Sequence, residues 1–266
     1  MKIIEVKNVS KHFGDVKAVD NISFSVEKGK IFAFLGPNGA GKTTTIKMLT
    51  TLLDPSSGTI ELNGYNVVSK PDATRHSFGI VFQDPSIDTE LTAYENMQFH
   101  AVLYGIKSST YGPRIKELLE LVELWDRKDD LVKDFSGGMK RRLEIARGLL
   151  HHPKVLFLDE PTLGLDPQTR NHIWSYILNL NKKEDLTVFF TTHYMEEADK
   201  VADEVSIIDH GKIISHGTPN ELKQRTNSKT LEDAFLALTG KDVREEEANP
   251  KDAMRQARQM WTGNKR

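Results

Sequence analysis

The sequence of 266 residues contains no cysteine, so disulfide bonds and thiolate chemistry are excluded, and a reducing compartment would suit the chain. It also lacks any apolar run close to the about 18 residues that a membrane-spanning helix needs, and it does not begin with the apolar stretch of a secretory signal. No excess of one charge sign is present: the formal net charge is −2, and interspersed acids and bases give no indication of nucleic-acid binding. We therefore expect a soluble protein that needs a partner for any role at a membrane.

A glycine-rich stretch fits the pattern G-x-x-x-x-G-K-[ST] without a mismatch. It consists of Gly36, Pro37, Asn38, Gly39, Ala40, Gly41, Lys42, Thr43 and Thr44. The apolar run 31–35 before it predicts a buried strand and the segment 44–53 after it predicts a helix, which is the context that this pattern requires. Backbone N–H groups of such a loop surround phosphate oxygens, while Lys42 reaches the β- and γ-phosphates and Thr43 offers a hydroxyl to Mg²⁺. The sequence therefore predicts a site for a nucleoside triphosphate.

Short strand-like segments alternate with helical segments along most of the chain. Strands are expected at residues 3–9, 22–26, 31–35, 59–62, 79–82, 155–158, 187–190 and 205–208. The pattern between about 92 and 150 is helical, with interruptions near 107–113 and 126–134, and further helices are expected after residue 219 and over 231–238. This alternation is typical of an α/β fold with a mostly parallel sheet, here interrupted by a helical insert.

Two acidic residues follow the strand predicted at 155–158. Its four consecutive apolar residues suit a strand buried on both faces of a parallel sheet, and ligands of such sheets lie beyond the carboxyl ends of the strands. Asp159 would hold Mg²⁺ there, through water, and Glu160 would orient and deprotonate an attacking water. Two acids at a strand end can also be merely solvated, but their occurrence with the phosphate loop favours the catalytic interpretation.

A second helix start also suits an anion. Ser136, Gly137 and Gly138 precede a helical pattern, with Ser136 as a plausible N-cap and two glycines that permit close approach of a ligand to the backbone. By itself this segment predicts only a capped helix.

The order and spacing of the phosphate loop, the Ser-Gly-Gly segment and an apolar strand ending in Asp159 and Glu160 resemble the nucleotide-binding subunit of ATP-binding cassette (ABC) transporters. The resemblance covers about residues 2–240 and implies a P-loop ATPase with an antiparallel β portion besides the core sheet. We accordingly expect an ABC nucleotide-binding domain over 1–240, with its helical insert at about 90–150. A charged extension follows over 241–266.

Further residues match family positions one by one. Gln83 resembles the glutamine that contacts Mg²⁺ and the attacking water, in a loop that touches the membrane subunit. His193 resembles the switch histidine that binds the γ-phosphate, and residues 164–167 resemble the loop that couples two sites. Phe13 lies where the family stacks an aromatic ring on adenine. The resemblance thus assigns Glu160, His193 and Gln83 to catalysis, with ATP and Mg²⁺ as cofactors.

The family's Ser-Gly-Gly segment caps the nucleotide of a partner, so the resemblance implies a head-to-tail dimer of two copies of this chain that sandwiches two ATP molecules. The commonest family motif is Leu-Ser-Gly-Gly-Gln, whereas Phe135 and Met139 flank the segment here. A methionine cannot make the polar contact of a glutamine side chain, which bears on contacts near the ribose.

The segments 84–88, 135–142, 162–167 and 231–240 resemble the drug-resistance exporters of this family, such as the daunorubicin-resistance group. This implies an ATPase subunit that is cytoplasmic, peripheral on the inner face of the cell membrane and bound to an integral membrane permease, with no nucleic acid as partner. Two alternatives stay open: the ATPase subunit of an importer, and a soluble ABC ATPase without a transport role. The transported substrate is not readable from this chain.

Three remaining features have ordinary interpretations. His151 and His152 are adjacent and lack further ligands, which argues against a metal site. The basic run 140–142 is expected to be a solvated helix face. A short helix is predicted from Asn249 and Pro250, with an apolar stripe that packs on the protein's own body. That stripe consists of Met254, Ala257 and Trp261.

Overall fold

A computed structural model describes residues 1–240 of the chain. The helix predicted from Asn249 and Pro250, with its stripe of Met254, Ala257 and Trp261, lies outside the described residues. Among residues 1–240, no helix has the length and apolar character that crossing a membrane requires.

A six-stranded sheet forms the centre of the fold, in the strand order β10-β9-β3-β8-β7-β6. Its members are β3 (Ile31–Leu35), β6 (Phe78–Val81), β7 (Val155–Asp159), β8 (Thr187–Thr191), β9 (Glu204–Asp209) and β10 (Lys212–Gly217). All neighbouring pairs are parallel except β10 with β9. Every residue of β3, β7 and β8 is buried, because helices and the second sheet cover both faces of these strands.

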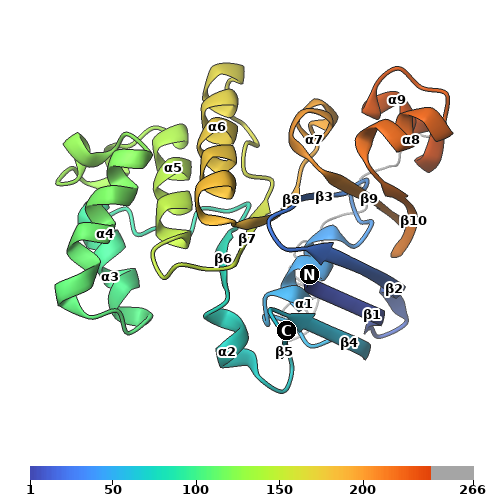
Figure 1. Cartoon of the computed structure of the whole chain (residues 1–266), viewed down its shortest axis with the longest axis horizontal. Helices are drawn as coiled ribbons and strands as arrows, with labels where there is room; N and C mark the ends of the chain where they lie inside the picture. The colour runs from blue at the N-terminus through green and yellow to red at the C-terminus, as the bar shows by residue number, and fades with distance from the viewer. Residues whose placement is uncertain (241–266) are drawn as a thin grey trace, which may run out of the picture.

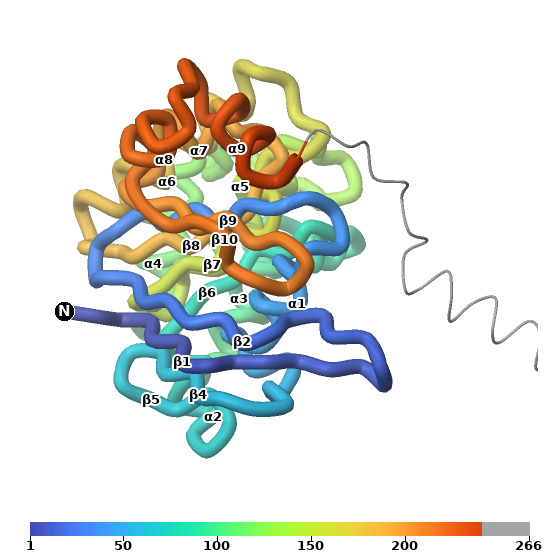
Figure 2. The backbone as a smooth tube through the Cα atoms, turned by 90° about the vertical axis from the view of Figure 1, so that its right-hand side faces the viewer, coloured from blue at the N-terminus to red at the C-terminus, as the bar shows by residue number. Residues whose placement is uncertain are grey.

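A second, antiparallel sheet has the order β2-β1-β4-β5. It consists of β1 (Lys2–Phe13), β2 (Val16–Glu27), β4 (Ser57–Leu62) and β5 (Tyr65–Asn66). Figure 2 shows this sheet layered below the β9–β10 edge of the central sheet. The strands predicted at 3–9 and 22–26 belong to much longer strands, because the turn after Phe13 closes a hairpin whose pairing continues past the apolar positions.

The helices lie around these sheets, with α3, α4 and α5 grouped on the side opposite the antiparallel sheet (Figure 1). The bounds are α1 (Lys42–Leu49), α2 (Pro71–Arg75), α3 (Ala93–Leu103), α4 (Ser108–Leu121), α5 (Gly137–Gly148), α6 (Pro167–Glu184), α7 (Met195–Val201), α8 (Pro219–Arg225) and α9 (Leu231–Thr239). Two 3₁₀ turns, Trp125–Arg127 and Val132–Asp134, separate α4 from α5. The α/β class with a helical insert and an antiparallel portion is therefore confirmed.

Two helix boundaries differ from the sequence-based expectation. The helix after the phosphate loop ends at Leu49 rather than at residue 53, since Thr51 adopts a left-handed conformation with φ 60°. The interruption expected near 107–113 ends before Ser108, and Pro113 lies inside α4. Gly112 precedes that proline and has no Cβ to clash with its ring, and the buried Ile115 anchors the next turn.

Candidate active site

The phosphate loop connects β3 to α1, and two of its glycines have no room for a side chain. A Cβ on Gly36 would lie 2.4 Å from the carbonyl oxygen of Ile208 in β9. Gly41, which caps α1, has a φ of 109° and would place a Cβ 2.6 Å from the carbonyl oxygen of Ala18. The loop is therefore held between β9 and β2, with the N-terminus of α1 opening onto it.

Lys42, the first residue of α1, folds back over the loop. Its ammonium group donates to the carbonyl oxygens of Gly36 at 2.7 Å and Pro37 at 3.1 Å, and only 6% of the residue is exposed. Burial lowers the pKa of Lys42, against the opposing effect of the nearby Glu160 and Asp159 carboxylates. A buried cation thus lies within the field of two acids.

Asp159 ends β7 as predicted and is 3% exposed. One carboxylate oxygen accepts a hydrogen bond from Thr191 at 2.6 Å, and the other lies 3.5 Å from the hydroxyl of Thr43. Burial raises the pKa of Asp159, and the neighbouring Glu160 charge adds to that increase. Thr43 and Asp159, two of the three residues predicted to bind Mg²⁺, are therefore adjacent although they lie 116 positions apart in the sequence.

Glu160 and His193 form a direct contact. The imidazole Nε2 lies 2.6 Å from Glu160 Oε1, while Glu160 Oε2 is buried without a hydrogen-bond partner in the described part of the chain. Glu160 adopts a left-handed backbone conformation, with φ 52°, which is costly for a residue with a side chain. The strained backbone directs an incompletely paired carboxylate into the site.

Gln83 follows β6, whose register places Val81 beside Leu158 of β7. Gln83 lies two residues after Val81, and Glu160 lies two residues after Leu158. Both residues therefore follow the carboxyl ends of neighbouring strands, at the same edge of the sheet. The Gln83 side chain is exposed, and none of the hydrogen bonds of residues 1–240 involves it. The structure brings this residue to the site's edge without joining it to Thr43 or Asp159.

Ser136, Gly137 and Gly138 begin α5, and the Ser136 hydroxyl accepts from the backbone N–H of Met139 at 3.2 Å as expected for an N-cap. A Cβ on Gly138 would lie 2.7 Å from the Thr169 side chain, so this segment packs against α6. Within residues 1–240, no hydrogen bond or ion pair joins the Ser-Gly-Gly segment to the phosphate loop. The two predicted anion sites therefore share no hydrogen bond or ion pair within the described part of the chain.

Phe13 ends β1 and is 50% exposed. The Lys11 ammonium lies 5.4 Å from its ring centroid. The structure places this ring on the surface, and adenine stacking stays a prediction.

Sequence reasoning missed Thr191, a fully buried residue that ends β8. Its hydroxyl donates to Asp159 and accepts from the backbone N–H of Glu160 at 3.1 Å. One hydroxyl thus orients both acids. Its position two residues before His193 was the available signal, but a threonine in a strand is usually a packing residue.

The expectation that residues 140–142 form a solvated helix face is wrong for Arg141, which is 7% exposed. Its guanidinium donates to the carbonyl oxygens of Phe82 at 2.6 Å and Gln83 at 3.0 Å, and pairs with buried Glu144 at 3.1 Å. Glu144 in turn accepts from the backbone N–H of Ser86 at 2.7 Å. Helix α5, which Ser136 caps, therefore fixes the loop that contains Gln83, because Arg141 and Glu144 of α5 bind the backbone of that loop.

The His151 ring is packed and bonded within the fold. Its Nε2 lies 2.8 Å from the carbonyl oxygen of Phe78, and its ring stacks on Tyr104 at 3.9 Å between centroids. Burial lowers the pKa of His151 to about 4.

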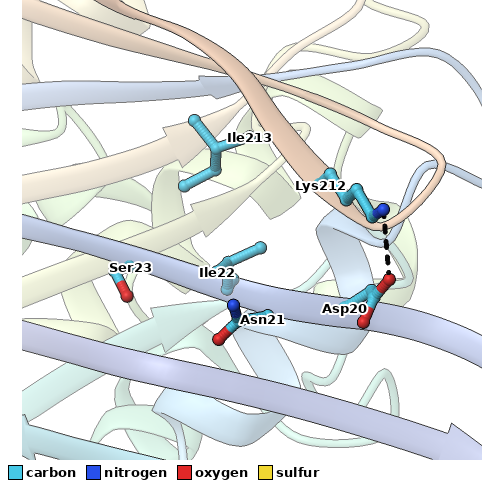
Figure 3. Close-up of a pocket in the computed structure, with 6 residues that line it drawn as sticks. All are labelled: Asp20, Asn21, Ile22, Ser23, Lys212 and Ile213. Carbon is cyan, nitrogen blue, oxygen red and sulfur yellow. Dashed lines mark ion pairs between the residues drawn. The ribbon is translucent and has the colours of Figure 1, made fainter.

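A surface depression of about 540 Å³ lies between β2 and β10 (Figure 3). An ion pair of 3.4 Å between Lys212 and Asp20 closes one end of it. Its lining contains no residue of the phosphate loop and none of the two acids, so it is separate from the site built above.

Comparisons with known sequences agree with this geometry. The family description "ABC transporter" matches residues 19–163. The linearmycin resistance ATP-binding protein LnrL of Bacillus subtilis is 42% identical over 229 residues, which are 86% of this chain and 73% of that protein. The daunorubicin/doxorubicin resistance ATP-binding protein DrrA of Streptomyces peucetius is 42% identical over 230 residues, 86% of this chain and 69% of that protein. The Nod factor export ATP-binding protein I of Ralstonia nicotianae is 42% identical over 220 residues, 83% of this chain and 68% of that protein.

Solved structures agree as well. An ATP-binding subunit of an ABC transporter superposes with a TM-score of 0.81 at 29% identity, covering 89% of this chain and 99% of that one. A dimeric ATP-binding cassette in a post-hydrolysis state, bound to ADP and Pi, superposes with a TM-score of 0.72 at 25% identity, covering 81% of this chain and 98% of that one. The chain belongs to the ABC transporter family, as an ATPase that binds and hydrolyses ATP.

Proposed function

We propose that this ATPase powers export through a separate membrane permease, as a dimer of two copies at the inner face of the membrane. Relatives named for drug resistance and for Nod factor export support the direction of transport. Residues 1–240 serve as the nucleotide-binding domain with a helical insert at about 90–150, the loop of Gln83 contacts the permease, and 241–266 is an extension.

The phosphate loop and Lys42 bind the triphosphate. Phosphate oxygens take the place of the Gly36 and Pro37 carbonyls as partners of the Lys42 ammonium, which then neutralises charge on the β- and γ-phosphates. Phe13 covers the adenine, because its exposed ring offers a stacking face.

The donors around Thr43 fit Mg²⁺. A hydroxyl and a buried carboxylate lie 3.5 Å apart there, which is the small set of hard oxygen donors that this ion takes besides substrate phosphates and water. Thr43, Asp159 and Gln83 would hold the ion, and Mg²⁺ bound there would neutralise charge on the transferring phosphoryl group.

Glu160 acts as the general base. Its unpaired Oε2 is the acceptor for a proton of the attacking water, which the Gln83 amide helps to orient. His193 exchanges its contact with Glu160 for one with the γ-phosphate when nucleotide enters, so it stabilises charge that develops in the transition state.

The working unit is a head-to-tail dimer. Ser136, Gly137 and Gly138 form a helix N-terminus that no hydrogen bond or ion pair within residues 1–240 joins to the phosphate loop of the same chain. They therefore serve the γ-phosphate bound by the second copy, and the solved dimeric cassette with ADP and Pi supports this arrangement.

The observation that carries the proposal is the convergence of Lys42, the adjacent pair Asp159 and Glu160, and His193 from three separate segments. Glu160→Gln should retain ATP binding, lose turnover by about 100-fold or more, and accumulate an ATP-bound dimer in size-exclusion chromatography. Lys42→Ala should lose ATP affinity and stay monomeric. Near-normal turnover of Glu160→Gln would contradict the base assignment.

The export role needs a second experiment. Affinity purification from solubilised membranes should recover an integral membrane protein together with this chain. Proteoliposomes that contain this chain and the recovered membrane protein should move substrate away from the face that binds ATP. The same proteoliposomes with Glu160→Gln in place of the natural chain should not. Movement in the opposite direction would favour the importer alternative, and recovery of no membrane protein would favour an ATPase without a transport role.

A further inference from the structure

Glu197 is a buried carboxylate that the mechanism above does not use. It lies in the first turn of α7, the helix that follows His193, and is 7% exposed. Burial of a carboxylate costs free energy unless it accepts hydrogen bonds, so the donors to Glu197 indicate which segments it holds in place.

The partners of Glu197 are two threonine hydroxyls. Thr162 lies 2.8 Å from one carboxylate oxygen and 2.9 Å from the other, sharing its single proton between them. Thr192 donates to Oε2 at 3.1 Å. Both threonines are buried, so these contacts are not exchanged with water.

The two threonines belong to the segments that carry the proposed catalytic pair. Thr162 lies two residues after Glu160, and Thr192 immediately precedes His193. Glu197 therefore joins the chain that leaves β7 to the chain that leaves β8. The Glu160–His193 contact of 2.6 Å spans the same two segments.

The only cation near Glu197 in the described chain is Arg170, at 4.0 Å. That guanidinium also pairs with Glu196 at 3.4 Å and lies 4.2 Å from the Tyr194 ring centroid. The hydroxyls are closer than the cation, so Glu197 is held chiefly by the segments that it joins rather than by a salt bridge.

We propose that Glu197 is a positioning residue, which sets the separation of Glu160 and His193 by holding Thr162 and Thr192. This inference rests on the proposed roles of Glu160 and His193. Glu197 makes no contact with the phosphate loop, so its removal should change the chemical step and leave nucleotide binding intact.

The test compares Glu197→Ala with Glu196→Ala, its neighbour in the same helix turn. Glu196 shares the Arg170 contact but touches neither threonine, which makes it a matched control. Glu197→Ala should lower kcat for ATP about 10- to 100-fold, because small misplacements of catalytic groups cost that much, with KM and the Kd of a non-hydrolysable ATP analogue within threefold. Glu196→Ala should keep kcat within twofold.

A second pair of variants covers a failure of Glu197→Ala to fold. The double variant Thr162→Val, Thr192→Val removes both donors at nearly constant volume and should also lower kcat at unchanged KM. Glu197→Gln, which keeps one acceptor oxygen, should recover part of the kcat lost in Glu197→Ala. Thermal unfolding measured for each variant identifies the variants that do not fold. The kcat values of the folded variants then decide whether Glu197 is a positioning residue.

Unchanged kcat in a folded Glu197→Ala variant or in the double valine variant would overturn the inference. Equal losses of kcat and of affinity for the ATP analogue would also overturn it, because a merely structural role predicts that result. Glu160→Gln and His193→Ala are measured in parallel. If those two retain turnover, the proposed roles themselves fail. If they lose turnover while Glu197→Ala does not, only the present inference fails.

Discussion

The Nε2 atom of His193 lies 2.6 Å from Oε1 of Glu160, a contact between residues that follow the ends of two neighbouring parallel strands, β8 and β7. In this arrangement the histidine contacts one carboxylate oxygen, and the other is buried without a hydrogen-bond partner among residues 1–240. Nucleotide binding must therefore take His193 away from Glu160 if the histidine is to reach a γ-phosphate.

We expect His193→Ala to lower kcat for ATP by about 100-fold, because a donor that stabilises developing charge is lost. The substitution also leaves both oxygens of the buried Glu160 without a side-chain partner, so the free energy of unfolding should fall by about 1–3 kcal/mol. Steady-state ATPase assays and urea unfolding measure the two effects. His172→Ala, an exposed histidine on α6, should change neither.

Thr191→Val should lower kcat about tenfold, because Asp159 loses a 2.6 Å hydrogen bond and the Glu160 N–H loses an acceptor. Thr187→Val on the same strand is the matched control. Thr187 is equally buried and accepts from the Gly29 N–H at 2.9 Å, far along the strand from the acids. Both variants should lose about 1–3 kcal/mol of stability, whereas only Thr191→Val should lose turnover. Equal kcat in the two variants would contradict the role of Thr191.

Arg141→Met should destabilise the fold by about 3–5 kcal/mol, because Glu144 then remains buried without its cation. Burial raises the pKa of Glu144, and the hydrogen bond from Ser86 and the charges of Arg141 and Arg147 oppose that increase. Burial lowers the pKa of Arg141, and the charge of Glu144 opposes that decrease. The double variant Arg141→Met, Glu144→Leu should recover much of the loss in urea unfolding. Lys7→Met, which breaks an exposed pair with Glu5, should leave the free energy of unfolding nearly unchanged, because water screens that pair. A single Arg141→Met variant as stable as Lys7→Met would exclude a structural role for the pair.

Stability should fall as the pH drops below 6.5. Burial, with the positive charge of Arg147, lowers the pKa of His100 to about 3, and burial lowers that of His151 to about 4. In the unfolded chain both histidines take up protons near pH 6.5, while the folded chain keeps them neutral, so the unfolded state binds more protons in this window. Each should therefore add up to about 1.4 kcal/mol per pH unit to the slope of unfolding free energy between pH 6.5 and 5.

Urea unfolding at several pH values in that window measures this slope. The double variant His100→Phe, His151→Phe should have a flatter slope than the natural chain, since it has no group to protonate on unfolding at these positions. Identical slopes would mean that these histidines titrate alike in both states.

Local rules were sufficient for the phosphate loop and for the strand that ends in Asp159. The loop depends on a short consecutive pattern, and burial of every β7 residue follows from an uninterrupted apolar run. The same rules failed at Pro113 and at Arg141. In both places tertiary packing compensated a locally unfavourable residue: α4 is anchored by the buried residues that follow the exposed Pro113, and a buried carboxylate pairs with the Arg141 guanidinium.

The sequence by itself determined the phosphate loop, the alternation of strands and helices and the family, because each is encoded in residues close together along the chain. Only the tertiary structure decided which residues meet: the Glu160–His193 contact, the hydroxyl of Thr191 on both acids, and the carboxylate of Glu197 between two threonines. Those contacts join segments about thirty residues apart, and their geometry depends on the register of parallel strands, which no local pattern specifies.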